Sequence, residues 1–258
     1  MGDMLLAEKM IKAAAVSGAT HVKFQYWKET NLKPGKWDKD GRREIYRSAQ
    51  LNDDRIVTLN KLAKINNLIS FYSVFSVSEL KKLNDLGENI IKIPSHEIYN
   101  LDLIKKSFKL FNFVILSTGA CKEEELIEVA SLSKNYEGKL VVMHCVSSYP
   151  CTSDMINLPR LEVLSKLFPR ATLGLSDHTQ STIIPAVSVP FGVRVVEKHF
   201  TSDQNLPGRD NKFALLPDQF HQMVTNFDEA ISACQFLGVG AQSSEKDIMN
   251  NYRGRWGG

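Results

Sequence analysis

Seven short apolar runs in this sequence end in side chains that can do chemistry. In chain order, these ends carry Lys23 and Gln25, Ser73, Lys92 with Ser95 and Glu97, Ser117 and Thr118, His144, Ser176 with Asp177 and His178, and Glu197 with His199. If the runs are parallel strands of one sheet, their carboxyl ends converge on one face, where the active sites of such folds lie. The pattern therefore predicts a single site assembled from many strand ends.

Two of these residues, His178 and His199, end consecutive runs and are candidate metal ligands. Neighbouring strands would bring the two rings close enough to share one ion, and imidazole binds borderline divalent metals well. Two neutral ligands leave positions for water and substrate oxygens. Taken singly, each histidine is better explained as a hydrogen-bonded core or rim residue, but with Asp177 and Glu197 beside them the pair favours a metal.

Lys23 and Lys92 lie within apolar runs, so we expect their ammonium groups to point into the enclosed side of the sheet. A buried lysine needs an anionic partner or a lowered pKa. Together with nearby hydroxyl groups, the two lysines predict a pocket for a phosphate and a carboxylate. Two alternatives stay open, namely a Schiff-base lysine in a metal-free aldolase, and lysines paired with Glu97 or Glu197 for structure alone. The hydroxyl groups belong to Ser73, Ser95, Ser117, Ser147 and Ser176.

Two loops adjoin the ends of the runs. Residues 205–210, N-L-P-G-R-D, directly follow the last run, and their proline and glycine favour a sharp turn from which Asp210 can accept a substrate hydroxyl. Residues 28–43 form a long polar loop after the first run. This second loop is either a lid over the site or a solvated excursion.

The apolar runs alternate with stretches of helical periodicity. Buried strands are predicted for the apolar runs at 22–25, 68–75, 90–95, 113–119, 140–145, 172–178 and 193–200. Helices are predicted for the stretches at 54–66, 76–86, 122–133 and 158–168. This order is typical of a parallel sheet with right-handed crossovers, so we expect a (β/α)8 TIM barrel. Such a barrel has eight strands, and the sequence opens on a helix whose N-cap is Asp3, so we expect the first strand to lie before Met1.

Composition sets the remaining bounds. The 258 residues are 43% apolar and contain no linker-like tract, so we expect residues 1–258 to form a single domain. The net charge of +3 comes from scattered basic and acidic residues, which argues against a nucleic-acid partner. The four cysteines have no C-x-x-C spacing and no signal peptide is evident, so we expect a cytoplasmic protein. Since the apolar runs are far shorter than the roughly 20 residues of a membrane span, we expect no membrane partner.

Seven motifs, in order and compatibly spaced, resemble the sialic acid synthase family, which includes the N-acetylneuraminate, legionaminate and pseudaminate synthases and their spore-coat polysaccharide relatives. The resemblance extends from about Gly2 to Trp256. The motifs are V-K-F-Q at 22–25, K-I-P-S-H-E at 92–97, I-L-S-T-G at 115–119, H-C-V-S-S-Y-P at 144–150, G-L-S-D-H-T at 174–179, E-K-H-F-T at 197–201 and L-P-G-R-D at 206–210.

The resemblance implies a barrel that condenses phosphoenolpyruvate with an N-acetylated amino-sugar aldehyde, similar to N-acetylmannosamine, to give a nonulosonic acid and phosphate. His178 and His199 would hold Mn²⁺ or Mg²⁺, and Gln25, Tyr149 and Asp210 would lie near the sugar. Ser147 stands where some relatives have asparagine. The residues that would hold phosphoenolpyruvate are Lys23, Ser73, Lys92, Ser95, Ser117, Ser147 and Ser176, and the predicted catalytic set is Lys23, Lys92, Glu97, Glu197 and Asp210.

The sequence departs from the family pattern at both ends. Relatives begin with a strand that carries E-I-G, and they commonly continue past the Y-R-G-R-W segment, here 252–256, into a small antifreeze-like domain. We expect both to be absent from this sequence.

Two other functions stay open. One is a related phosphoenolpyruvate-dependent synthase that acts on a sugar phosphate, and the other is a non-catalytic barrel that binds a sugar or phosphoenolpyruvate. A barrel that lacks one strand exposes sheet edges, so we also expect a homo-oligomer, a dimer in the simplest case.

Overall fold

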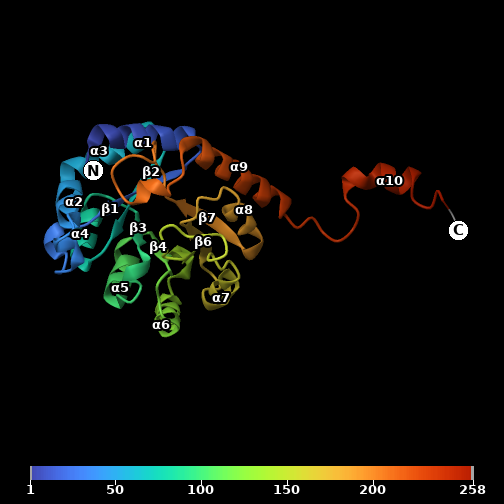
Figure 1. The fold of residues 1–258 in the computed structure, drawn as a ribbon. Coiled ribbons are helices and arrows are strands. Elements are labelled where there is room, and N and C mark those ends of the chain that lie inside the picture. Colours follow the sequence, from blue (N-terminus) through green and yellow to red (C-terminus); the bar gives the residue numbers. More distant parts are fainter. Residues whose placement is uncertain (1, 257–258) are drawn as a thin grey trace.

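Seven parallel strands form one curled sheet in chain order (Figure 1). The computed structural model describes residues 2–256. The strands are β1 (His21–Tyr26), β2 (Ile69–Val74), β3 (Ile90–Ile93), β4 (Phe113–Ser117), β5 (Leu140–Cys145), β6 (Thr172–Asp177) and β7 (Val193–Lys198). All seven strands predicted from the apolar runs are confirmed, as is their parallel order.

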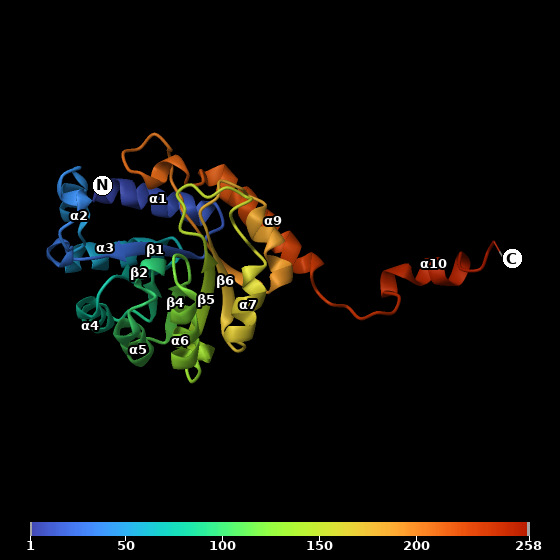
Figure 2. The same ribbon diagram turned by 60° about the horizontal axis from the view of Figure 1, so that its bottom comes forward.

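Helices α1 to α9 lie on the outer side of this sheet, and α10 lies on an arm that leaves it (Figures 1 and 2). They are α1 (Met4–Val16), α2 (Arg42–Ala49), α3 (Asp53–Ile65), α4 (Val77–Asp85), α5 (Leu101–Leu110), α6 (Glu123–Ser133), α7 (Arg160–Leu167), α8 (Ile184–Val187), α9 (Pro217–Ala233) and α10 (Lys246–Asn251). The predicted helices correspond to α3, α4, α6 and α7. The predicted N-cap of α1 is confirmed, because Asp3 Oδ1 accepts the N–H groups of Leu5 and Leu6.

The two faces of the sheet bury different side chains. On the outer face, large apolar residues such as Tyr72, Leu116 and Leu175 pack under the helices. On the inner face, Phe71, Ile115 and Met143 fill the bottom of the curl. Because successive side chains on a strand point to opposite faces, the next inward positions along each strand lie nearer its carboxyl end. Those are the polar positions, so the alternation places the predicted site above an apolar floor.

The sheet curls until its two edge strands face each other. β1 and β7 are the edges of the strand order, yet Lys23 on β1 lies 2.8 Å from Glu197 on β7, measured from Nζ to Oε2. Outside the sheet, α1 packs against α9 across the same opening. The fold is thus barrel-like. The predicted strand before Met1 stays a prediction.

The loop at 28–43 is anchored by one arginine. Arg43 donates to Glu29 Oε1 at 2.6 Å and to the carbonyl oxygen of Leu32 at 3.0 Å, and it pairs with Asp38. These contacts hold the loop against the start of α2. A lid role for the loop stays a prediction.

After α9, residues 234–256 leave the sheet as an extended arm that carries α10 (Figures 1 and 2). Its apolar side chains contact solvent, with Val239 99% exposed and Trp256 89% exposed. Such exposure of large apolar groups is unusual unless another surface covers them. Within residues 2–256, no helix combines the length and apolar character needed to cross a bilayer.

Candidate active site

Two lysines and one glutamate form the centre of the site. Lys92 on β3 is only 2% exposed; its ammonium group donates to Ser117 Oγ and lies 3.7 Å from Glu197 Oε1. The other carboxylate oxygen of Glu197 pairs with Lys23, and Ser176 Oγ donates to Oε1 at 2.9 Å. Two ammonium groups therefore share one carboxylate, which leaves the cluster with an excess of positive charge.

The pKa values in this cluster follow from that arrangement. Burial alone would raise the pKa of Glu197, but the adjacent Lys23 and Lys92 hold it well below its usual range. Burial also lowers the pKa of Lys92 to about 8, against the attraction of Glu197. An anion bound beside Lys92 would favour the charged ammonium, so the cluster is suited to bind a phosphate or a carboxylate.

A glycine brings the backbone close to the predicted hydroxyl groups. The N–H of Gly119, in the loop after β4, donates to Ser95 Oγ at 3.1 Å. A Cβ at Gly119 would lie 2.5 Å from Ser147 Oγ and 2.9 Å from Ser95 Oγ, so a side chain there would collide with both. Ser73 pairs in register with Lys92 in the neighbouring strand. The structure thus gathers the predicted serines around the two lysines.

His178 and His199 face each other at the mouth, with ring centroids 5.2 Å apart. Nδ1 of His178 lies 3.0 Å from the carbonyl oxygen of Val146 and donates to it. Burial opposes protonation of this ring, but its contacts with Cys145 and Val146 raise its pKa, so a metal ion would take the place of a proton on Nε2. Burial, reinforced by the charges of His178 and Lys23, lowers the pKa of His199 to about 3. His199 is therefore neutral at physiological pH, which is the form that binds metals.

The donor set at this mouth fits a divalent ion with open coordination positions. Among residues 2–256, no group of three or more His, Cys, Asp or Glu side chains is arranged to hold a metal. The paired imidazoles offer two nitrogen ligands, and an Asp210 oxygen lies 3.8 Å from His199 Nδ1. An ion held by the two rings would take its other ligands from water and substrate, as predicted. The metal site stays a prediction.

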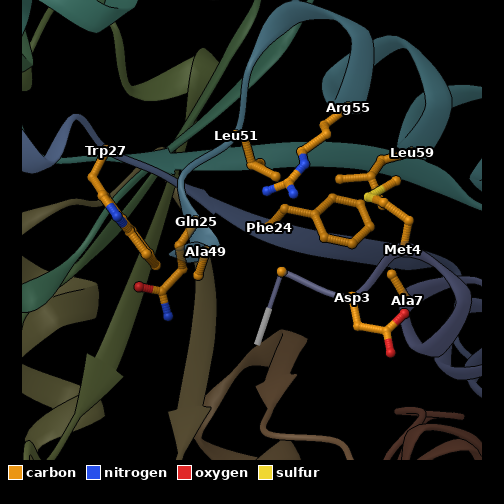
Figure 3. A pocket seen from close by; sticks show the side chains of 11 residues that line it. Asp3, Met4, Ala7, Phe24, Gln25, Trp27, Ala49, Leu51, Arg55 and Leu59 are labelled. Atoms are coloured by element: carbon orange, nitrogen blue, oxygen red, sulfur yellow. The ribbon is translucent and has the colours of Figure 1, made fainter. Parts of the chain in front are cut away.

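The residues expected near the sugar lie around the rim of the mouth. The ring of Tyr149 packs 4.3 Å from that of His178, and burial raises the pKa of Asp210. Gln25 lies two residues beyond Lys23 on the same face of β1 and lines a cavity of about 180 Å³. Figure 3 shows Gln25 and Trp27 on one side of this cavity and apolar side chains, including Phe24, on the other.

Glu97 lies apart from this cluster. β3 ends at Ile93, and Glu97 falls in a 3₁₀ turn, Ser95–Glu97, where Nε2 of the neighbouring His96 lies 4.0 Å from its Oε1. Burial raises the pKa of Glu97. Of the two carboxylates considered as partners of the lysines, the structure brings only Glu197 to them; a catalytic role of Glu97 stays a prediction without a contact to support it.

Asp177 and His144 also point away from the mouth. Asp177, which the sequence analysis considered beside the metal, pairs instead with Lys198 on the other face of the sheet. The ring of His144 is fully buried, with Nε2 hydrogen-bonded to the carbonyl oxygen of Ile156.

Two neighbours of the site were missed by the sequence analysis. Cys145 Sγ lies 3.9 Å from His178 Nδ1 and 3.8 Å from Ser147 Oγ, so the thiol belongs to the wall of the pocket. Gly119 is the second. The alternation of β5 predicts an inward Cys145, but nothing in the sequence alone shows how closely the loop at Gly119 approaches the serines.

The fold and the site together define a parallel α/β barrel-like protein whose polar centre lies at the carboxyl ends of the strands. A model of the NeuB family matches residues 10–238, and the chain belongs to that family. It is 33% identical over 264 residues to N,N'-diacetyllegionaminic acid synthase of Campylobacter jejuni, covering 97% of this chain and 78% of that protein. It is 30% identical over 262 residues to pseudaminic acid synthase of the same species, covering 97% and 75%.

A solved structure is similar over nearly the whole chain. The crystal structure of N-acetylneuraminic acid (sialic acid) synthetase from Leptospira borgpetersenii in complex with citrate superimposes with a TM-score of 0.87 and 27% identity. The match covers 98% of this chain and 88% of that one. The resemblance found in the sequence motifs is thereby confirmed.

Proposed function

We propose that this protein condenses phosphoenolpyruvate with the open-chain aldehyde of an N-acetylated amino sugar, giving a nonulosonic acid and phosphate. The observation that carries the proposal is the pair of lysines, Lys92 buried and Lys23 partly buried, that share Glu197 beside two neighbouring imidazoles. Membership of the NeuB family supports it, because the relatives are named as synthases of such acids.

The lysine cluster would hold phosphoenolpyruvate. Lys23 and Lys92 would neutralise its phosphate and carboxylate, while Ser95 and Ser117 would donate hydrogen bonds to their oxygens, with the Ser95 hydroxyl held by the N–H of Gly119. Holding the enol carbon next to the aldehyde removes much of the entropic barrier to their reaction. The walls of the buried pocket would also restrict the access of water.

C3 of phosphoenolpyruvate attacks the aldehyde carbon and forms the new C–C bond, while the aldehyde oxygen takes up a proton. Asp210, beside His199 at the mouth, would pass on that proton, and burial raises the pKa of its carboxyl group. Water then adds at C2 and loses one proton, which restores the acid. The tetrahedral centre collapses to the C2 ketone as the C–O bond to phosphate breaks, and the hydroxyl proton leaves with the phosphate.

His178 and His199 would hold the proposed Mn²⁺ or Mg²⁺. When bound, such an ion would polarise a carbonyl oxygen placed between the rings. Independently of the ion, Tyr149 and Gln25 would bind the sugar chain around the mouth.

A phosphate-release assay tests this function. We expect phosphate release only when phosphoenolpyruvate, Mn²⁺ and an N-acetylmannosamine-type sugar are all present, with the new acid detected by mass spectrometry. Release with a sugar phosphate in place of the amino sugar would favour the alternative synthase, and binding of phosphoenolpyruvate without turnover would favour a non-catalytic barrel.

We also propose that the protein is a cytoplasmic homodimer in which the arm at 234–256 packs on a second copy. The exposed apolar side chains of the arm, including Phe236 and Val239, support this proposal. The four cysteines are free, which agrees with a reducing compartment.

Truncation of the arm tests the proposed dimer. We expect the full chain to sediment as a dimer and a variant that ends at Ala233 to associate about a hundredfold more weakly, because buried apolar anchors dominate such interfaces. Equal association of both forms would contradict a role of the arm.

A further inference from the structure

The strands that carry the two histidines end at the same level of the sheet. In the β6–β7 ladder, Ser176 pairs with Glu197 and Asp177 pairs with Lys198, which is the last pair. His178 and His199 are the next residues on each chain. The backbone ladder therefore ends just before the two rings and does not itself fix their separation.

Asp177 and Lys198 form an ion pair on the face of the sheet opposite to the site. Their side chains are 0% and 1% exposed, and Lys198 Nζ lies 2.5 Å from Asp177 Oδ2. The residues before the ion pair, Ser176 and Glu197, and the two histidines after it all point into the mouth, where Ser176 donates to Glu197. The ion pair thus joins β6 to β7 on the outer face of the sheet, one residue before each histidine.

The ion pair also holds the backbone on both sides of His178. Asp177 Oδ1 accepts the N–H of Thr179 at 2.8 Å, and Lys198 Nζ donates to the carbonyl oxygen of Thr179 at 2.5 Å. Asp177 and Thr179, which flank His178, are therefore both bound to Lys198, the residue before His199. This connection is buried and its polar groups are satisfied, so it is rigid.

We propose that Asp177 and Lys198 are positioning residues that set the separation and direction of the His178 and His199 rings without touching substrate. Groups behind metal ligands commonly orient them, and here the orientation would act through the backbone. The inference rests on the proposed metal role of the two histidines. It adds a residue pair whose effect on the rings can be measured apart from phosphoenolpyruvate binding, since its hydrogen bonds hold Thr179, the residue after His178, and none of them reaches the lysine cluster.

The double variant Asp177→Asn with Lys198→Met tests the proposal, because it removes both charges and nearly conserves volume. We expect its affinity for Mn²⁺, measured by calorimetry, to fall about 10- to 100-fold, while KM for phosphoenolpyruvate changes little. If the double variant does not fold, Thr179→Val is the second test, because it removes the hydroxyl bonds to Asp177 and Lys198, together with the one that the hydroxyl accepts from the N–H of Ser181. We expect this milder change to weaken Mn²⁺ binding about threefold to tenfold.

A readout without metal separates this inference from the proposed function. In metal-free protein labelled with ¹⁵N-histidine, we expect the double variant to shift the ring signals of His178 and His199 and to leave those of His21 and His221 in place. If the parent protein binds no Mn²⁺, the metal role fails, but these signals still test the positioning.

Glu137→Gln is the matched control. Glu137 is a buried carboxylate that accepts the N–H of Arg170 at 2.7 Å, near the start of β5 and away from the mouth. We expect this variant to lose stability without changing Mn²⁺ affinity or the two ring signals. Parent-like affinity and signals in the double variant, or equal changes in Glu137→Gln, would overturn the proposal.

Discussion

Lys92→Met is expected to lower kcat/KM for phosphoenolpyruvate by about a hundredfold or more, because it removes the buried one of the two ammonium charges in the anion pocket. Glu197 keeps Lys23 as its partner in this variant, so the fold should persist. Steady-state phosphate release at varied phosphoenolpyruvate measures the effect. The control is Lys106→Met on α5, an exposed lysine paired with Asp102 away from the site.

The same lysine predicts a pH dependence. Since burial lowers the pKa of Lys92 to about 8, the ammonium form dominates below that pH and the neutral amine above it. kcat/KM for phosphoenolpyruvate should therefore decline as the pH rises through about 8, and Lys92→Met should lack this decline. An alkaline limb that persists unchanged in the variant would assign it to another group.

His178→Ala and His199→Ala are each expected to reduce Mn²⁺-stimulated phosphate release by at least about a hundredfold. The reason is that loss of a group that only orients a metal ligand already lowers metal affinity or activity about 10- to 100-fold. Each variant removes one of the two facing rings and leaves the lysine cluster intact. We expect calorimetry to show weaker Mn²⁺ binding and nearly normal binding of phosphoenolpyruvate.

His221→Ala, on the exposed side of α9, is the control for both histidine variants. Its Mn²⁺ affinity and phosphate release should match those of the parent. Phosphate release at the parent rate in His178→Ala and His199→Ala would end the metal hypothesis and favour a metal-free mechanism.

The sequence could predict the strands because a parallel sheet covered on its outer face needs apolar residues along nearly the whole strand. It could also predict the inward direction of Lys23 and Lys92, since alternation fixes the face once the strand is known. The facing of His178 and His199 follows from the same rule, applied to two neighbouring strands.

The remaining features depend on geometry beyond the strands. Glu97 stands only five residues after Lys92, yet the 3₁₀ turn directs it elsewhere, and no periodicity reports where such a turn points. The close approach of Gly119 to Ser147 joins two loops from different strands. The arm at 234–256 was not expected because its apolar residues have no strand or helix periodicity that separates them from core residues.

The ion pair between Lys23 and Glu197 lies at the centre of the pocket, and it also joins β1 to β7, the first and last strands of the sheet. An anion that binds Lys23 competes with Glu197 for the same ammonium group. Binding of an anion would therefore weaken the contact between β1 and β7, and this cost would appear as a lower measured affinity and a correspondingly smaller rise in Tm.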